Sequence, residues 1–188
     1  MMNKNITAVI LCGGQSKRIG TNKAFLKIGD KSFIEVLIHK LQGLFKNIII
    51  STKDAAPYRH LKSSRVAIVK DRSRVLGSLV GIHSALRKSG TKYILAIAVD
   101  MPTIETRLIK RLLRNYKGYD VIIPETQKGL EPLCAIYFKG CLPHIEKQIR
   151  CGNYKIIDFF DKIRIKTIRL NRNGLFNINT LRDYRFVL

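Results

Sequence analysis

Two adjacent glycines and a group of cations follow the first apolar run of the chain. The run Ile6–Leu11 leads into CGG at residues 12–14, and the cations that come next are Lys17, Arg18 and Lys23. Glycine lets the backbone approach another molecule closely, because no Cβ intervenes. Lysine and arginine attract anionic groups, and arginine can contact a phosphate through two parallel hydrogen bonds. Residue types and spacing together indicate that residues 12–23 form a phosphate-binding loop.

Polar side chains also follow three further apolar runs. These side chains are Ser51, Asp71 and Asp100. Two of these strand ends therefore carry carboxylates. Pro102 biases Met101 away from helical geometry, so we expect the chain to leave the strand extended and to display Asp100.

These side chains need a sheet to bring them together, and the apolar pattern predicts one. Short β-branched runs alternate with segments whose apolar residues recur at helical spacing. Strands are predicted at 6–11, 47–51, 66–69, 93–99, 121–123 and 131–138, and helices at 32–45, 78–87 and 104–115. Ser32 and Glu35 have the spacing of a capping box at the start of the first helix. The alternation is typical of an α/β fold with a mainly parallel sheet, whose ligands bind outside the carboxyl ends of strands.

Length and composition fit one domain, so we expect residues 1–188 to form a single unit. Hydrophobic residues make up 46% of the chain, which supports a packed core. The apolar runs are too short to cross a membrane and no secretory leader is seen, so a cytoplasmic location without membrane contact is expected. The cysteines lack metal-ligand spacing, and we expect each to be buried or half-buried. They are Cys12, Cys134, Cys141 and Cys151.

The formal net charge of +22 adds nucleic-acid binding as a function of another class. The 35 lysines and arginines are, however, spread along the whole chain, and aromatic residues do not interleave with them as a stacking platform requires. A nucleic-acid partner is therefore the less favoured interpretation. Diffuse positive charge would attract any polyanionic substrate.

Two common nucleotide-binding motifs fit the glycine loop poorly. The spacing from Gly14 to Gly20 is one residue too long for a P-loop, and Thr21 follows in place of lysine. The dinucleotide fingerprint G-x-G-x-x-G is absent from the sequence. The loop LCGGQSKRIGTNK, residues 11–23, instead resembles the signature L-[AC]-G-G-x-S-x-R-M-G-x-[DN]-K of nucleotidyltransferases that activate small molecules with a nucleoside triphosphate.

Further stretches resemble the same superfamily, in the same order and across nearly the whole chain. VDMP at residues 99–102 is similar to its metal-binding D-x-P motif, and Asp71 with GSLVG at 77–81 is similar to its D…G-P-L-x-G stretch. EPLCAIY at 131–137 resembles its E-P-L-x-A-x-Y strand, and NINT at 177–180 resembles its N-x-N-T motif. Within the superfamily, the chain most resembles the molybdenum cofactor guanylyltransferases, which join GMP to molybdopterin.

The resemblance implies a fold, ligands and site residues. The implied fold is a three-layer sandwich with a Rossmann-like sheet of the nucleotide-diphospho-sugar transferase type. The implied ligands are GTP, Mg²⁺ and a molybdopterin-type cofactor as acceptor, and other molybdenum cofactor biosynthesis proteins are implied partners. The implied nucleotide contacts are Leu11, Cys12, Gly13, Gly14, Lys23, Ser51, Asp71, Asp100, Asn177 and Asn179. The implied catalytic residues are Arg18, Lys23 and Asp100, and Asp100 is also the implied magnesium ligand.

The reaction that the resemblance implies needs charge neutralisation and in-line positioning more than an activated nucleophile, since a substrate phosphate is already an anion. Gly13 favours GTP, because relatives that use CTP tend to carry alanine at this position. A nucleotidyltransferase that uses CTP, or that acts on another small phosphorylated acceptor, is the alternative within the enzyme class.

Several residues depart from the family pattern or have an ordinary structural interpretation. Ile19, Asn22 and Ser78 replace methionine, aspartate and proline of the family motifs, and Ser51 stands where asparagine is common. Ser51 and Asp71 can also be ordinary loop and turn residues. Three further alternatives are open: Glu131 as a substrate contact or an ion-pair member, Asn177 and Asn179 as helix caps, and the basic stretch 164–172 as a solvated edge strand.

Overall fold

The computed structural model describes residues 2–13, 22–71, 77–170 and 175–187. Gly14 and Arg18, two residues with predicted roles at the phosphates, lie outside these ranges. The strands are β1 (Ile6–Leu11), β2 (Lys27–Ile28), β3 (Lys31–Ser32), β4 (Ile48–Thr52), β5 (Val66–Lys70), β6 (Tyr93–Ala98), β7 (Val121–Thr126), β8 (Gly129–Leu130), β9 (Cys134–Phe138) and β10 (Ile165–Arg169). The α-helices are α1 (Phe33–Gln42), α2 (Ser78–Lys88), α3 (Thr106–Asn115), α4 (Leu142–Arg150) and α5 (Leu181–Arg185). Short 3₁₀ helices are η1 (Lys23–Phe25), η2 (Ala56–Leu61), η3 (Lys139–Cys141) and η4 (Ile156–Lys162).

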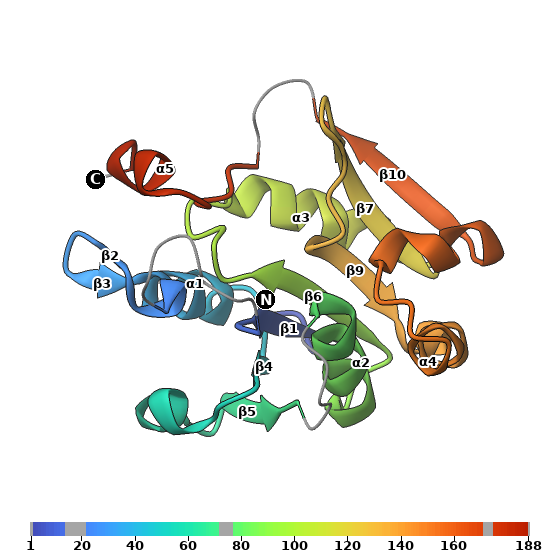
Figure 1. Cartoon of the computed structure of the whole chain (residues 1–188), viewed down its shortest axis with the longest axis horizontal. Coiled ribbons are helices and arrows are strands. Elements are labelled where there is room, and N and C mark those ends of the chain that lie inside the picture. The colour runs from blue at the N-terminus through green and yellow to red at the C-terminus, as the bar shows by residue number, and fades with distance from the viewer. Residues whose placement is uncertain (1, 14–21, 72–76, 171–174, 188) are drawn as a thin grey trace.

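The main sheet has the strand order β10-β7-β9-β6-β1-β4-β5, and β8 pairs with the end of β7 (Figure 1). Strands β5, β4, β1 and β6 run parallel to one another, and β10 runs parallel to β7. Strand β9 inserts antiparallel between β6 and β7. The predicted mainly parallel sheet is confirmed. Because β1, β4, β5 and β6 are parallel neighbours, the residues that follow them meet at one edge.

Two hydrophobic cores lie on opposite faces of this sheet. Successive residues of a strand point to opposite faces, so Ile10 packs in the core that contains α1 and α3, whereas Val9 packs in the core that contains α2 and α4. Both side chains are fully buried. Helices cover both faces, which gives the three layers that the resemblance implies.

The first predicted helix forms with its predicted cap. The Glu35 carboxylate accepts hydrogen bonds from the Ser32 backbone N–H, at 2.7 Å, and from the Ser32 hydroxyl. The helix ends at Gln42 and not at Phe45, because the chain caps at Gly43.

Two other predicted boundaries are corrected, and several elements form where none was predicted. Helix α3 starts at Thr106 and not at Ile104, whose N–H donates to the Met101 carbonyl within a turn. Strand β9 starts at Cys134 and not at Glu131, because the Cys134 N–H donates to the Glu131 carbonyl and EPL forms a turn. Helices α4 and α5 and the β2–β3 hairpin lie in segments without a predicted element.

The basic stretch at 164–172 contains β10, which lies at the edge of the main sheet as predicted. Within it, Ile168 is buried whereas Thr167 and Arg169 are exposed. The prediction for the cysteines is confirmed for three of them and wrong for Cys151, which is exposed beyond the end of α4. Within the described ranges, every helix is too short or too polar to cross a membrane.

Candidate functional site

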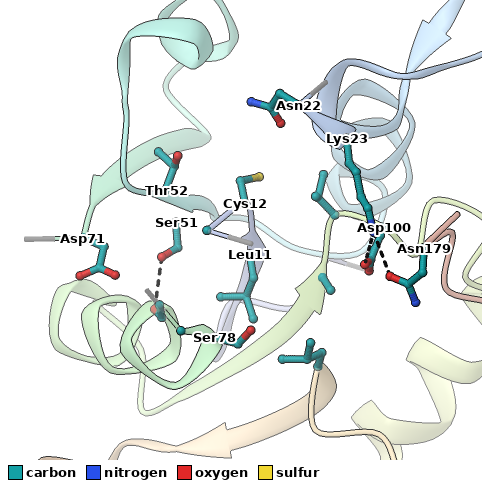
Figure 2. A pocket seen from close by; sticks show the side chains of 16 residues that line it. Leu11, Cys12, Asn22, Lys23, Ser51, Thr52, Asp71, Ser78, Asp100 and Asn179 are labelled. Atoms are coloured by element: carbon teal, nitrogen blue, oxygen red, sulfur yellow. Dashed lines mark hydrogen bonds and ion pairs between the residues drawn. The ribbon is translucent and has the colours of Figure 1, made fainter. Parts of the chain in front are cut away.

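A pocket opens where the parallel strands end (Figure 2). The segments that follow β1, β4, β5 and β6 meet there with the start of η1, the start of α2 and the C-terminal segment. The lining residues are Leu11, Cys12, Gly13, Asn22, Lys23, Ser51, Thr52, Asp71, Gly77, Ser78, Gly81, Ala98, Val99, Asp100, Leu133 and Asn179. Every candidate residue that the structure describes, except Asn177, belongs to this set.

Lys23 links two distant parts of the chain at one end of the pocket. Its ammonium lies 3.4 Å from Asp100 Oδ2 and donates a hydrogen bond to Asn179 Oδ1 at 2.9 Å (Figure 2). The Lys23 and Asp100 side chains are 14% and 20% exposed, so water screens the pair only partly. The Asp183 carboxylate fixes Asn179 in turn, because it accepts the Asn179 backbone N–H at 2.9 Å.

Asp100 has an oxygen that is available to a cation. Its Oδ1 is buried and has no hydrogen-bond partner in the described part of the chain. Burial raises the pKa of the Asp100 carboxyl above its ordinary value, and the nearby Lys23 ammonium opposes this shift. A buried carboxylate oxygen without a partner is costly, and a metal ion would satisfy it.

The donors around Asp100 fit magnesium. Carboxylate and amide oxygens are the hard ligands that Mg²⁺ takes, and it commonly keeps one or two carboxylates with phosphates and water as the remaining ligands. Among the described residues, no group of three histidine, cysteine, aspartate or glutamate side chains could form a complete protein cage. A metal at Asp100 would therefore depend on a phosphorylated ligand for part of its shell.

Ser51 and Asp71 lie at the side of the pocket away from Lys23 (Figure 2). Ser51 is 2% exposed, and its hydroxyl donates to the Gly81 carbonyl at 3.2 Å. Asp71 is also buried, and its backbone N–H donates to the Thr52 carbonyl at 2.8 Å. The pocket thus has polar groups at both ends, with the apolar Leu11 side chain between them.

Asn177 lies in a neighbouring cavity. This cavity shares Asn179 with the pocket, and Lys128 and Glu131 also line it. Asn177 Oδ1 is buried without a hydrogen-bond partner in the ranges that the structure describes. Burial raises the pKa of the Glu131 carboxyl, which accepts a hydrogen bond from the Thr126 hydroxyl at 3.2 Å.

Several lining residues had no role in the sequence interpretation, among them Thr52, Gly81 and Leu133. Gly81 lies in GSLVG and Leu133 in EPLCAIY, two stretches that resemble superfamily motifs. The sequence therefore contained a signal for both residues. A Cβ on Gly81 would lie 3.2 Å from Leu11 Cδ2 and 3.3 Å from Ser51 Oγ. Glycine at this position therefore lets α2 approach β1 and β4 closely.

Comparison with known proteins decides the family. Residues 8–163 match the MobA-like NTP transferase domain family. The chain belongs to this family. A protein from Pelotomaculum thermopropionicum named "Probable molybdenum cofactor guanylyltransferase" is 35% identical over 185 residues, which cover 94% of this chain and 89% of that protein. A protein from Desulfosudis oleivorans named "Molybdenum cofactor guanylyltransferase" is 32% identical over 185 residues, which cover 93% and 90% of the two chains.

A solved structure supports the same assignment. The crystal structure of molybdopterin-guanine dinucleotide biosynthesis protein A from Archaeoglobus fulgidus superimposes with a TM-score of 0.82 and 26% identity, over 96% of each chain. The α/β nucleotidyltransferase fold is thereby confirmed for this MobA-like chain. The matched family segment includes Lys23, Asp100 and Glu131, whereas Asn177 and Asn179 lie beyond its end.

Proposed function

We propose that the chain is a molybdenum cofactor guanylyltransferase, which transfers GMP from GTP to the phosphate of a molybdopterin-type acceptor. An acceptor oxygen would bond to the α-phosphorus of GTP while the bond from this phosphorus to the bridging oxygen breaks, and pyrophosphate leaves. Membership of the MobA-like family and the names of its relatives support this reaction. One geometric observation carries the proposal: Lys23 and Asp100 lie 3.4 Å apart in a pocket at the ends of parallel strands.

The described residues would bind and orient the triphosphate. The Lys23 ammonium would move from Asp100 to the phosphates, where it neutralises the charge that builds up on the leaving pyrophosphate. Gly13 lines the pocket, and a Cβ added there would have no atom of a described residue within 4 Å, so its missing side chain leaves space beside the backbone. The nucleotide could therefore approach the backbone at Gly13. Asn179 would hold Lys23 in place through its hydrogen bond.

Asp100 would hold the magnesium ion through its unpartnered Oδ1. When bound, Mg²⁺ supplies Lewis acidity and orients the phosphate oxygens for in-line displacement. Asp100 itself is fixed by the chain around it, because its backbone carbonyl accepts the Ile178 N–H at 2.9 Å.

The cavity beside the pocket suits the acceptor. It meets the nucleotide pocket at Asn179, so an acceptor in it would reach the end of the pocket where Lys23 lies. Lys128 supplies a cation, while Glu131 and Asn177 supply oxygen acceptors for N–H groups of a ring. We infer that these residues contact the acceptor.

Gly13 is also the basis for proposing GTP over CTP, because a guanine edge could reach the backbone there. A CTP-using enzyme of the same family is the second candidate. We also propose that residues 1–188 are one nucleotidyltransferase domain, since both hydrophobic cores pack against the same sheet.

A turnover assay tests the proposed function. The protein is incubated with GTP, Mg²⁺ and molybdopterin, and we expect pyrophosphate release together with a guanine dinucleotide product. Lys23→Ala should raise the KM for GTP by about 10-fold or more, because a charge-assisted contact is lost. Turnover with CTP but not with GTP would favour the second candidate. Salt-sensitive DNA binding without binding of any nucleoside triphosphate would contradict the enzyme and favour a nucleic-acid-binding domain.

A further inference from the structure

Tyr58 lies behind the pocket and has no predicted role. It belongs to η2, and its side chain is 1% exposed. Its ring packs against Phe25 of η1, with ring centroids 5.2 Å apart. Tyr58 does not line the pocket, so it has no direct contact with a ligand bound there.

The Tyr58 hydroxyl has a side-chain partner from a segment that does line the pocket. Asn22 Nδ2 donates to the hydroxyl at 3.1 Å. The side chains of Cys12, which follows β1, and of Thr52, which ends β4, also influence the pKa of Tyr58. All three side chains line the pocket (Figure 2).

Asn22 follows directly after the glycine-rich sequence. Asn22 also caps η1, because its Oδ1 accepts the Ala24 backbone N–H at 3.1 Å, and Lys23 is the first residue of that helix. A path of direct contacts thus runs from the Tyr58 hydroxyl through Asn22 to the element that carries Lys23.

A buried tyrosine hydroxyl usually finds some hydrogen-bond partner, most often backbone or water. Tyr137 shows this ordinary arrangement, since its hydroxyl donates to the Pro132 backbone carbonyl at 2.6 Å. Tyr58 differs because its hydrogen-bond partner, Asn22, contributes a side chain that lines the pocket. Burial raises the pKa of the Tyr58 phenol and raises that of the Cys12 thiol to about 12, so both groups keep their protons at neutral pH.

We propose that Tyr58 is a positioning residue for the nucleotide site: its hydroxyl holds the Asn22 side chain and so sets the position at which η1, and with it Lys23, meets GTP. This inference rests on the proposed function. It predicts that the hydroxyl affects nucleotide affinity without contacting the nucleotide.

The test is the variant Tyr58→Phe, which removes the hydroxyl and keeps the ring that packs on Phe25. Titration calorimetry with GTP and Mg²⁺ at 25 °C should show affinity about 5- to 10-fold weaker than in the wild type, the scale of one lost hydrogen bond. In turnover assays the KM for GTP should rise while kcat changes by less than about twofold. Tyr93→Phe is the matched control, because Tyr93 lies at the opposite end of β6 from Asp100. It should leave GTP affinity unchanged.

Asn22→Ala and the double variant separate positioning from a loss of stability. Asn22 is exposed, so its replacement spares the core, and it removes the same contact from the other side. If Tyr58 acts through Asn22, the two losses of GTP affinity should not add. The Kd of the double variant should then be at most about twofold higher than the Kd of whichever single variant binds GTP more weakly. Unchanged GTP affinity in Tyr58→Phe, or fully additive losses, would overturn the inference while leaving the proposed function intact. A wild type that binds no GTP would overturn both.

Discussion

Lys23 and Asp100 lie far apart in the sequence, yet their side chains meet with 3.4 Å between Nζ and Oδ2. In the proposed function each group has a different partner: phosphates for the ammonium and a metal ion for the carboxylate. Burial works against the charged form of Asp100, as the direction of its pKa shift indicates. Such a residue costs stability and is typical of functional sites.

The first residue-scale prediction concerns Asp100→Asn. Turnover should fall by about 100-fold or more, because the charge that would hold magnesium is removed while the shape is kept. The melting temperature should stay the same or rise, since a carboxylate disfavoured by burial becomes neutral. Asp161→Asn, at an exposed position of η4, is the control and should keep full turnover. Wild-type turnover by Asp100→Asn would refute the proposed metal role.

The second residue-scale prediction concerns Gly13→Ala. A Cβ at this position has open space around it, and φ of Gly13 is not positive, so the variant should fold with wild-type stability. The added methyl group would occupy space that we assign to the guanine edge. The ratio of kcat/KM for GTP to that for CTP should fall by roughly 10-fold. An unchanged ratio would show that the base is selected elsewhere.

At the scale of elements, helix α1 supports the turn that carries Asp100. The Lys40 ammonium donates hydrogen bonds to the backbone carbonyls of Pro102, at 3.0 Å, and Ile104. Burial lowers the pKa of Lys40, and its charge is met by these carbonyl dipoles. The Lys23 ammonium is the nearby charge that opposes the upward shift in the pKa of Asp100. Lys40 therefore supports the site by holding its backbone.

Lys40→Met should weaken magnesium binding. Loss of both hydrogen bonds would loosen the turn after Asp100, and the Mg²⁺ concentration at half-maximal turnover should rise by about 10-fold. Lys40→Arg can donate to the same carbonyls and should restore most of the wild-type value. Lys110→Met changes an exposed lysine of α3 and serves as the control. If Lys40→Met only lowers the melting temperature, the residue is structural and does not position Asp100.

The capping box of α1 predicts a pH dependence of stability. Hydrogen bonds from Ser32 lower the pKa of Glu35 below its ordinary value of 4.5. A lowered pKa in the folded state stabilises the protein above pH 4.5, and this contribution is lost as the pH falls through the folded-state value. Glu35→Gln should therefore destabilise the protein more at pH 7 than at pH 3.5, as measured by urea unfolding. Glu105→Gln, at an exposed position without a side-chain cap hydrogen bond, should show no such difference.

At the scale of the whole molecule, the strands that build the site were predictable and the rest of the sheet was less so. Cys12 and Asp100 follow apolar runs whose length and β-branching indicate strands, and the parallel-sheet rule places such ends together. No local sequence pattern indicates that β9 inserts antiparallel into the sheet, because strand direction depends on pairing with distant strands. The role of Leu133, which the turn before β9 brings to the pocket, was missed for this reason.

The two C-terminal asparagines show a second limit of sequence reasoning. Asn177 and Asn179 belong to one short motif, yet Asn179 reaches Lys23 whereas Asn177 lines the neighbouring cavity. The path of the backbone in this irregular segment decides which cavity each asparagine side chain lines, and residue types do not encode that path. Tyr58 is a similar case, since its buried environment and its hydrogen bond with Asn22 arise only when η2 packs behind the pocket.

The measurement that tests the central claim most directly is equilibrium binding of GTP and of CTP, each with and without Mg²⁺, to the wild-type chain. A nucleotide that is held between the Lys23 cation and a metal at Asp100 should bind tightly only when magnesium is present, and GTP should bind more tightly than CTP. Equal, magnesium-independent binding of both nucleotides, or no binding of either, would contradict the account.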